Sequence, residues 1–198
     1  MADSLTTAYY DQSAEEYFNR TVEVDMSTTC NRFLQHVKPG GRIIDIGAGS
    51  GRDIKYFLNA GFVVEGIDAS LELCQLAAKY SGVSVQCISI EDWRPSIQYD
   101  GLWANASLLH LSLDDIEEFF RRLHLILAEN GVAYMSFKTG IATGRDEIGR
   151  YFTDVSMETV QQMVAKSTAI SLIDSWTTDD KLNRNDFEWI NVILRKTQ

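Results

Sequence analysis

The clearest candidate for chemistry is the stretch RIIDIGAGSGRD at residues 42–53. A short apolar run carries Asp45 near its end, and Gly47, Gly49 and Gly51 follow at alternate positions. Glycines after a buried strand let a ligand approach the backbone, and such turns often bind phosphate at a helix N-terminus. A carboxylate at the same turn opposes that phosphate, because two unit charges about 4 Å apart repel by about 4 kcal/mol at an effective dielectric near 20.

Two cofactors therefore compete for this turn. A dinucleotide such as NAD fits less well, because Arg52 stands where the GxGxxG fingerprint needs its third glycine. S-adenosylmethionine has no phosphate and carries an ammonium and a sulfonium, so Asp45 becomes favourable. Asp68 ends the next apolar run, about 20 residues beyond Gly47, where an acid accepts hydrogen bonds from the ribose of either cofactor.

The turn thus favours S-adenosylmethionine, with an NAD-dependent oxidoreductase and a non-catalytic nucleoside-binding module as alternatives. Asp45 has a structural alternative as the cap of its turn, and Asp68 has one as a helix N-cap.

Alternating strand and helix patterns position these residues. Short apolar runs predict strands at 42–46, 62–68, 83–90, 99–106 and 132–138. Helical spacing of apolar residues predicts helices at 52–60, 70–80 and 156–166, and another that follows a capping box at Ser112 and stops at Gly131. This rhythm predicts a parallel sheet covered by helices on both faces. The last two β-rich runs, 169–176 and 187–195, have only a polar loop between them and should form an antiparallel edge hairpin.

Residues 1–36 precede the first strand and are expected to form a helical lid. Ligands of open α/β sheets bind at the carboxyl ends of the strands, which such an arm can cover. Tyr10, Tyr17 and Arg20 fall near one helical face, where Arg20 would pair with the carboxylate of S-adenosylmethionine. The alternative is that the tyrosines pack and Arg20 is solvated.

Composition narrows the possible partners. The 198 residues fit one domain, 1–198, and a net charge of −10 argues against nucleic acid. No apolar stretch approaches the roughly 18 residues of a membrane span, and the acidic N-terminus resembles no targeting peptide. We therefore expect a cytoplasmic protein. Cys30, Cys74 and Cys87 form no CxxC pair, so we expect no metal site and assign the cysteines to apolar packing.

Several ordered motifs carry a family resemblance. VKPGGRIIDIGAGSGRD, GIDAS, YDGLWANASLLHLS and NGVAYMSFK resemble the class I S-adenosylmethionine-dependent methyltransferases, from about residue 8 to the end. Within that superfamily, YYDQSAEEYFNRT, GRYFTD and FEWINVILRK are similar to small bacterial enzymes of the tellurite-resistance type.

The resemblance implies a Rossmann-like, doubly wound sheet of seven strands in the order 3-2-1-4-5-7-6. It also implies roles for particular residues. Asp45 and the three glycines would line the methionine end of the cofactor, and Asp68 would bind the ribose. Ile90, Glu91 and Trp93 would flank the adenine, although Ser89 stands where many relatives carry aspartate. Asn105 would lie near the methyl group. Trp93 could instead pack in the core, and Asn105 could instead form a local backbone hydrogen bond.

The acceptor end is expected beyond the fourth strand. His110 would take a proton or orient the nucleophile, although a lone histidine in an apolar stretch is more often structural. Arg150 and Tyr151 lie in the polar segment after the fifth strand, where Arg150 would attract an anionic acceptor. The fourth strand ends in ANAS rather than the N/D-P-P-Y type of sequence of base-modifying enzymes, so a small-molecule acceptor is favoured. The cysteines form no cluster for trivalent arsenic, and the sequence leaves the oligomeric state open.

Overall fold

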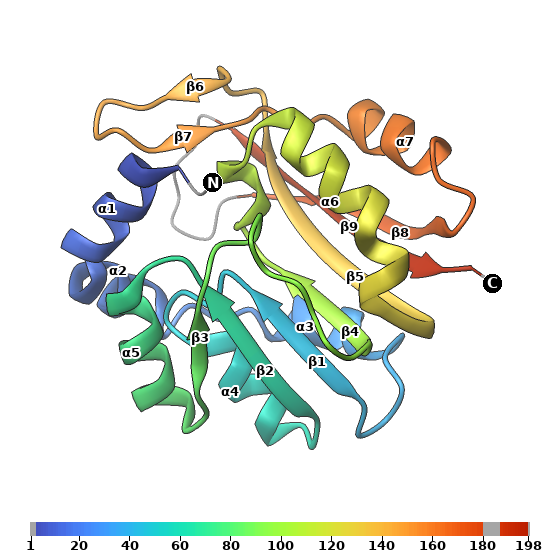
Figure 1. Cartoon of the computed structure of the whole chain (residues 1–198), viewed down its shortest axis with the longest axis horizontal. Coiled ribbons are helices and arrows are strands. Elements are labelled where there is room, and N and C mark those ends of the chain that lie inside the picture. The colour runs from blue at the N-terminus through green and yellow to red at the C-terminus, as the bar shows by residue number, and fades with distance from the viewer. Residues whose placement is uncertain (1–2, 180–186, 198) are drawn as a thin grey trace.

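A sheet of seven strands in the order β3-β2-β1-β4-β5-β9-β8 forms the centre of the computed structural model, which describes residues 3–179 and 187–197 (Figure 1). The strands are β1 Arg42–Ile46, β2 Val63–Asp68, β3 Val85–Cys87, β4 Tyr99–Ala104, β5 Leu127–Thr139, β8 Ile170–Thr178 and β9 Glu188–Lys196. The first five in chain order pair in parallel, and β9 runs antiparallel to both β5 and β8.

This arrangement confirms the Rossmann-like sheet and its C-terminal edge hairpin. The numbering differs from the expected 3-2-1-4-5-7-6 because two short strands, β6 Gly144–Arg145 and β7 Tyr151–Phe152, form a separate hairpin that the sequence did not predict. The expected polar loop of the edge hairpin lies largely at residues 180–186, outside the described part of the chain.

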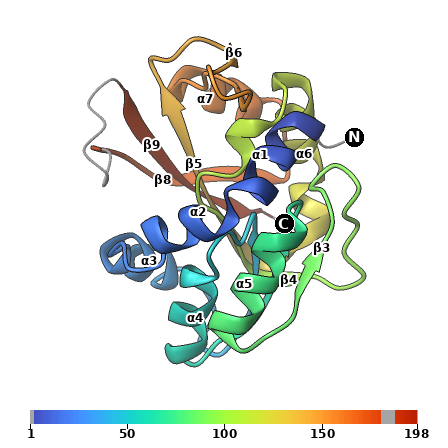
Figure 2. The same ribbon diagram turned by 90° about the vertical axis from the view of Figure 1, so that its left-hand side faces the viewer.

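Helices cover both faces of the sheet (Figures 1 and 2). They are α1 Ser4–Gln12, α2 Ala14–Thr21, α3 Ser27–Leu34, α4 Arg52–Asn59, α5 Leu71–Ser81, α6 Leu113–Ile126 and α7 Met157–Ala165, with a 3₁₀ turn, η1, at Leu108–His110. None of the described helices has the length and apolar character that crossing a membrane requires.

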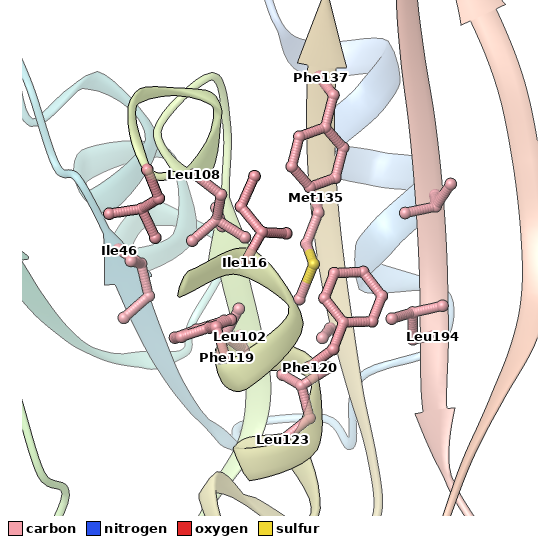
Figure 3. Packing of buried hydrophobic residues seen from close by; sticks show 14 of the residues in the cluster. Ile46, Leu102, Leu108, Ile116, Phe119, Phe120, Leu123, Met135, Phe137 and Leu194 are labelled. Carbon is pink, nitrogen blue, oxygen red and sulfur yellow. The ribbon is translucent and has the colours of Figure 1, made fainter. Parts of the chain in front are cut away.

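The alternation of side chains along β1 divides the core into two layers. Ile44 and Ile46 join the layer under α6 and α7, where Phe120 lies beside Met135 of β5 and Phe119 beside Leu102 of β4 (Figure 3). Ile43 points to the opposite layer.

That opposite layer, under α3 and α4, contains a cluster of aromatic rings. Phe33, Phe57 and Trp103 contact one another, and the rings of Trp103 and Tyr134 stack with their centroids 4.0 Å apart. Buried bulky side chains pack against both faces of the central strands. The carboxyl ends of β1 and β4 are therefore held in a fixed position.

Several boundaries differ from the sequence prediction: β3 covers only Val85–Cys87 of the expected 83–90, and β4 ends at Ala104 rather than at residue 106. Helix α6 ends at Ile126 and β5 begins directly at Leu127, so Gly131 lies inside a strand rather than stopping a helix. A Cβ at Gly131 would lie 2.9 Å from the carbonyl oxygens of Ala128 and Tyr99, which explains the glycine by close packing. Cys87 is exposed, so the expected packing role holds only for Cys30 and Cys74.

The N-terminal segment consists of three helices, and α1 is tied to two neighbours. Asp3 pairs with Arg145 of β6 through two hydrogen bonds of 2.6 and 2.7 Å. The Thr6 hydroxyl oxygen accepts the backbone N–H of Tyr151, and Asp11 accepts the hydroxyl of Ser70 before α5. Helix α1 is therefore fixed between the β6–β7 hairpin and the start of α5.

Gly51 offers a test of the close packing behind the glycine turn. It has φ +74°, and an added Cβ would lie 2.8 Å from the Ala77 carbonyl oxygen of α5. Gly82 has a similar φ of +86° with no atom within 4 Å of such a Cβ. We expect Gly82→Ala to cost about 1–2 kcal/mol of unfolding free energy from backbone strain. Gly51→Ala should cost about 1–3 kcal/mol more, because helix backbone cannot move aside. Equal losses of unfolding free energy for the two variants in urea would contradict the close packing of Gly51 against α5.

Candidate active site

Two adjoining cavities, of about 160 and 110 Å³, lie at the carboxyl ends of β1, β2 and β4. Gly47, Gly49 and Asn105 line both, as do Tyr10 and His110. The smaller cavity extends toward Asp68 and the segment after β3, and the larger one toward β5 and the β6–β7 hairpin. This is the edge at which open α/β sheets bind ligands.

The glycine turn is attached to β2 by its backbone. The N–H groups of Gly47 and Ala48 both donate to the Ile67 carbonyl at 2.9 Å. Gly47 has φ +76°, and a Cβ there would overlap the Cβ of Ser107. A Cβ at Gly49, which has φ +54°, would come within 3.2 Å of the Tyr17 ring. Gly47 and Gly49 line the cavities, whereas Gly51 lies against α5 and is absent from both linings.

Asp68 lies at the end of β2, in the wall of the smaller cavity. Its two carboxylate oxygens accept the backbone N–H groups of Gly49 and Ser70, each at 2.9 Å. Burial raises the pKa of Asp68, and these two hydrogen bonds oppose the rise. The carboxylate is thus fixed in orientation at the cavity wall, and its contact with a ribose stays a prediction.

Asp45 is buried at 3 % exposure but does not line either cavity. Within the described part of the chain its carboxylate has no hydrogen-bond donor. Burial raises the pKa of Asp45 well above its ordinary value, and the negative charge of Asp53 adds to this rise. Its contact with a cofactor stays a prediction.

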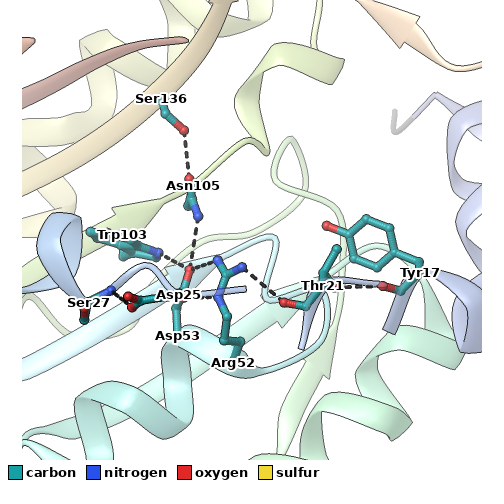
Figure 4. A network of polar contacts seen from close by, with 9 residues as sticks. All are labelled: Tyr17, Thr21, Asp25, Ser27, Arg52, Asp53, Trp103, Asn105 and Ser136. Atoms are coloured by element: carbon teal, nitrogen blue, oxygen red, sulfur yellow. Dashed lines mark hydrogen bonds and ion pairs between the residues drawn. The ribbon is translucent and has the colours of Figure 1, made fainter. Parts of the chain in front are cut away.

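Asp53, at the start of α4, lines the larger cavity, and sequence reasoning missed it. Its carboxylate accepts the indole N–H of Trp103 at 2.9 Å and the amide of Asn105 at 3.2 Å (Figure 4). Arg52 donates two further hydrogen bonds, at 2.7 and 2.9 Å. Although burial opposes ionisation, Arg52 and the indole and amide donors hold the pKa of Asp53 below its ordinary value.

The same network fixes Asn105 and the end of β4. The Ser136 hydroxyl donates to Asn105 Oδ1 at 3.0 Å and accepts the N–H of Ala106 at 2.8 Å. Ala106 has φ +56°, an uncommon conformation for a residue with a Cβ, and it lines both cavities. Asn105, predicted to lie near the methyl group, is therefore held in one orientation by β4, β5 and α4.

The lid residues lie at the cavities as expected. Tyr10 and Tyr17 line both, with their rings edge to face at 5.3 Å. Arg20 lines the larger cavity, where it lies over the Tyr17 ring and pairs with Glu16 at 3.5 Å.

Ile90 and Glu91 line the smaller cavity, beyond Asp68. Trp93 instead lies in the core at 4 % exposure, beside Tyr99, so the packing alternative holds for it.

His110 is held by both ring nitrogens. Nε2 lies 2.9 Å from the Tyr10 hydroxyl, and Nδ1 lies 2.7 Å from the Tyr151 carbonyl oxygen. Burial lowers the pKa of His110 from 6.5 to about 4, so the ring is neutral near pH 7.

Of the two expected acceptor residues, Arg150 lines the larger cavity and the side chain of Tyr151 does not. Tyr151 contributes its backbone, through the carbonyl that binds His110. Arg150 pairs with Asp146 at 2.7 Å. Lys138 of β5 also lines the larger cavity, with its ammonium 4.4 Å from the centroid of the Phe152 ring. Sequence reasoning did not single out Lys138, because it stands inside a buried strand.

Comparison with known proteins identifies the family. A family model described as "Methyltransferase domain" matches residues 18–190, and the chain therefore belongs to the methyltransferase domain family. The enzyme class expected from the sequence is confirmed by this match. Among curated proteins, none matches the sequence.

Solved structures of methyltransferases share the fold. The 1,6-didemethyltoxoflavin-N1-methyltransferase of Burkholderia thailandensis, solved with 1,6-didemethyltoxoflavin and S-adenosylhomocysteine, has a TM-score of 0.79 at 20 % identity, covering 98 % of this chain and 88 % of its own. The CcbJ methyltransferase of Streptomyces caelestis has a TM-score of 0.78 at 14 % identity, and the match covers 98 % of this chain and 100 % of that enzyme. The N-methyltransferase NodS of Bradyrhizobium japonicum, solved in complex with S-adenosylhomocysteine, has a TM-score of 0.69 at 13 % identity. The match covers 98 % of this chain and 100 % of that enzyme.

The buried pair of Arg52 and Asp53 should contribute far more to stability than an exposed pair. Asp53→Asn leaves the Arg52 guanidinium buried without its anion, and we expect a loss of about 3 kcal/mol of unfolding free energy. Glu118→Gln removes the partner of Arg121 on the exposed face of α6, and it should cost below about 1 kcal/mol. Urea unfolding at pH 7 measures both. A loss for Asp53→Asn no larger than for Glu118→Gln would show that the pair does not hold the site.

Proposed function

We propose that this protein transfers the methyl group of S-adenosylmethionine to a small-molecule acceptor. The family supplies the reaction class, and the observation that carries the proposal is the distribution of acids around the cavities. The carboxylates of Asp45 and Asp53 are buried around the glycine turn, that of Asp68 lies half-buried in the wall of the smaller cavity, and Arg52 is the cation that pairs with Asp53. A cofactor with a cationic methionine end fits this excess of negative charge, whereas a pyrophosphate does not.

The bound cofactor would extend across both cavities, with different residues contacting each of its parts. In the smaller cavity, Asp68 would accept the ribose hydroxyls, with Leu73, Ile90 and Glu91 beside the base. The glycine turn and Asn105 would hold the methionine end, and Tyr17 of the lid would cover it. When bound, S-adenosylmethionine supplies a methyl group activated by a positively charged sulfur. The protein's part is to exclude water and to hold an acceptor in line with that group.

The larger cavity is the proposed acceptor site. Lys138 and Arg150 bring two cationic side chains to its wall, and Phe152 and Trp189 add aromatic surface. A small molecule with a ring and a negatively charged group suits this lining. The structural neighbour from Burkholderia thailandensis, solved with bound 1,6-didemethyltoxoflavin, supports an acceptor of small-molecule size.

The narrower resemblance to tellurite-resistance-type enzymes stays a prediction. Its test is the formation of a volatile tellurium product by the purified protein with tellurite and S-adenosylmethionine. Absence of this product would leave the subgroup without support.

Ligand titration separates the proposed cofactor from NAD. We expect S-adenosylmethionine and S-adenosylhomocysteine to raise the melting temperature, and NAD to leave it unchanged. Asp68→Asn should weaken S-adenosylhomocysteine binding roughly 10- to 100-fold in calorimetry, because an ionic hydrogen-bond acceptor is lost. Glu65→Gln is the matched control: it lies on the same strand, binds Arg42 and Tyr99, and does not line either cavity. Stabilisation by NAD alone would overturn the proposal.

A further inference from the structure

The wall shared by the two cavities contains a hydrogen-bonded chain that begins on the lid. Tyr10, on α1, contacts His110, in η1 just after β4, and His110 contacts the backbone of Tyr151 in β7. The Tyr10 and His110 rings meet edge to face at 5.5 Å. Tyr10 and His110 both line the two cavities, so the chain is accessible from the proposed acceptor site and from the proposed cofactor site.

The partners of His110 determine where its proton lies. A carbonyl oxygen only accepts hydrogen bonds, so the short contact with the Tyr151 carbonyl requires a proton on Nδ1. The neutral ring then has its lone pair on Nε2, which accepts the hydroxyl proton of Tyr10. Arg150 also lies close enough to the Tyr10 oxygen to lower its pKa by charge and hydrogen bonding, and the oxygen's second lone pair remains for a ligand in the cavity. The chain thus has one direction, from the cavity through Tyr10 to Nε2.

The surroundings keep His110 neutral and Tyr10 protonated. Burial, together with the charges of Arg150 and Lys138, lowers the pKa of His110 to about 4, and the hydrogen bond to the Tyr151 backbone and the charge of Asp146 oppose this shift. The side chains that contact the ring from neighbouring elements are Tyr10 of α1 and Phe152 of β7. Burial also raises the pKa of the Tyr10 hydroxyl.

We propose that Tyr10 and His110 form a proton relay that serves the methyl acceptor, and that this acceptor is a compound whose reacting atom carries a proton, an O–H or N–H group. The inference rests on the proposed function of the same site. As a lone pair of the acceptor atom forms the bond to the methyl carbon, the sulfur–methyl bond breaks and leaves its electron pair on sulfur. The acceptor's proton passes to the Tyr10 oxygen, the Tyr10 proton passes to Nε2, and the imidazolium then releases a proton to water.

A base as weak as His110 is adequate for this step. The O–H or N–H group becomes strongly acidic once its atom begins to bond to the methyl carbon and gains positive charge. A base with a pKa near 4 can take that proton, and it stays unprotonated above about pH 5. An acceptor such as tellurite, which reacts through a lone pair on a tellurium atom that carries no proton, would need no relay.

The relay also depends on the position of the lid. Tyr10 belongs to α1, which Asp3 and Thr6 fasten to the β6–β7 hairpin, and the same hairpin carries the Tyr151 carbonyl. Both ends of the chain are therefore brought to His110 by segments outside the sheet. The relay is complete only when α1 is docked on the hairpin.

Nitrogen-15 NMR tests the hydrogen-bonded chain without an acceptor. The protein has three histidines. In the spectrum of histidine-labelled protein, the signals of His110 are therefore identified as those that are lost in His110→Gln. We expect the Nδ1–H tautomer and a pKa near 4 for His110. Tyr10→Phe should shift the Nε2 signal and raise that pKa. Tyr9→Phe, the neighbour whose hydroxyl has no hydrogen bond to His110, should leave both unchanged. An Nε2–H tautomer, or a Tyr10→Phe spectrum equal to wild type, overturns the relay.

Labelled-methyl transfer tests the acceptor class. The probes are phenols, hydroxy acids, primary amines, thioethers and tellurite, together with a small-molecule extract of cells. We expect product from O–H or N–H compounds, reduced about 100-fold in His110→Gln, with S-adenosylhomocysteine affinity within threefold of wild type. Transfer only to tellurite or thioethers, full activity of His110→Gln, or no transfer to any O–H or N–H compound overturns the proposal. Failure of the wild type to bind S-adenosylhomocysteine would instead contradict the proposed function, while the NMR result for the relay would stand.

Discussion

The buried ion pair of Arg52 and Asp53 is the interaction on which the site depends. Three acids gather around one turn, and a buried carboxylate is costly unless a cation and hydrogen-bond donors accompany it. Asp53 has both, because Arg52 supplies the charge and Trp103 and Asn105 supply donors from β4. The pair thereby joins the start of α4 to the end of β4. It also reaches the lid, since Arg52 donates to the Thr21 carbonyl at 3.3 Å.

The sheet could be predicted because its signals are local and repeated. Branched apolar runs mark the strands, and Asp68 stands out as an acid at the end of one of them. Features that depend on tertiary contact could not be predicted. Asp53 reads as an ordinary acid in the first turn of a helix, and Lys138 reads as one charge within an apolar strand. The start of β5 was missed because Leu127 continues the apolar pattern of the helix before it, with no turn residue between them.

The three glycines of the turn are required for different physical reasons. Sequence reasoning assigned all three to close approach by a ligand. In the structure, Gly47 makes room for Ser107 and Gly51 makes room for α5, so much of the motif serves contacts within the protein. Gly49 both lines the cavities and donates its N–H to Asp68. A similar mixture applies to Tyr151, which was expected among the acceptor residues: its backbone carbonyl contacts His110, and its side chain does not line either cavity.

The site is built from two structural layers with different constraints. Its floor, from the glycine turn to Asn105, belongs to strands packed on both faces, where a change of volume disturbs the core. Its roof consists of residues 3–21 and the β6–β7 hairpin, which touch each other through Asp3 and Arg145 outside the sheet. If the larger cavity is the acceptor site, as proposed, sequence changes in the roof would alter which acceptor is admitted while the floor continues to fold. Such a division would let one scaffold diversify its acceptors by exchanging two short peripheral segments together.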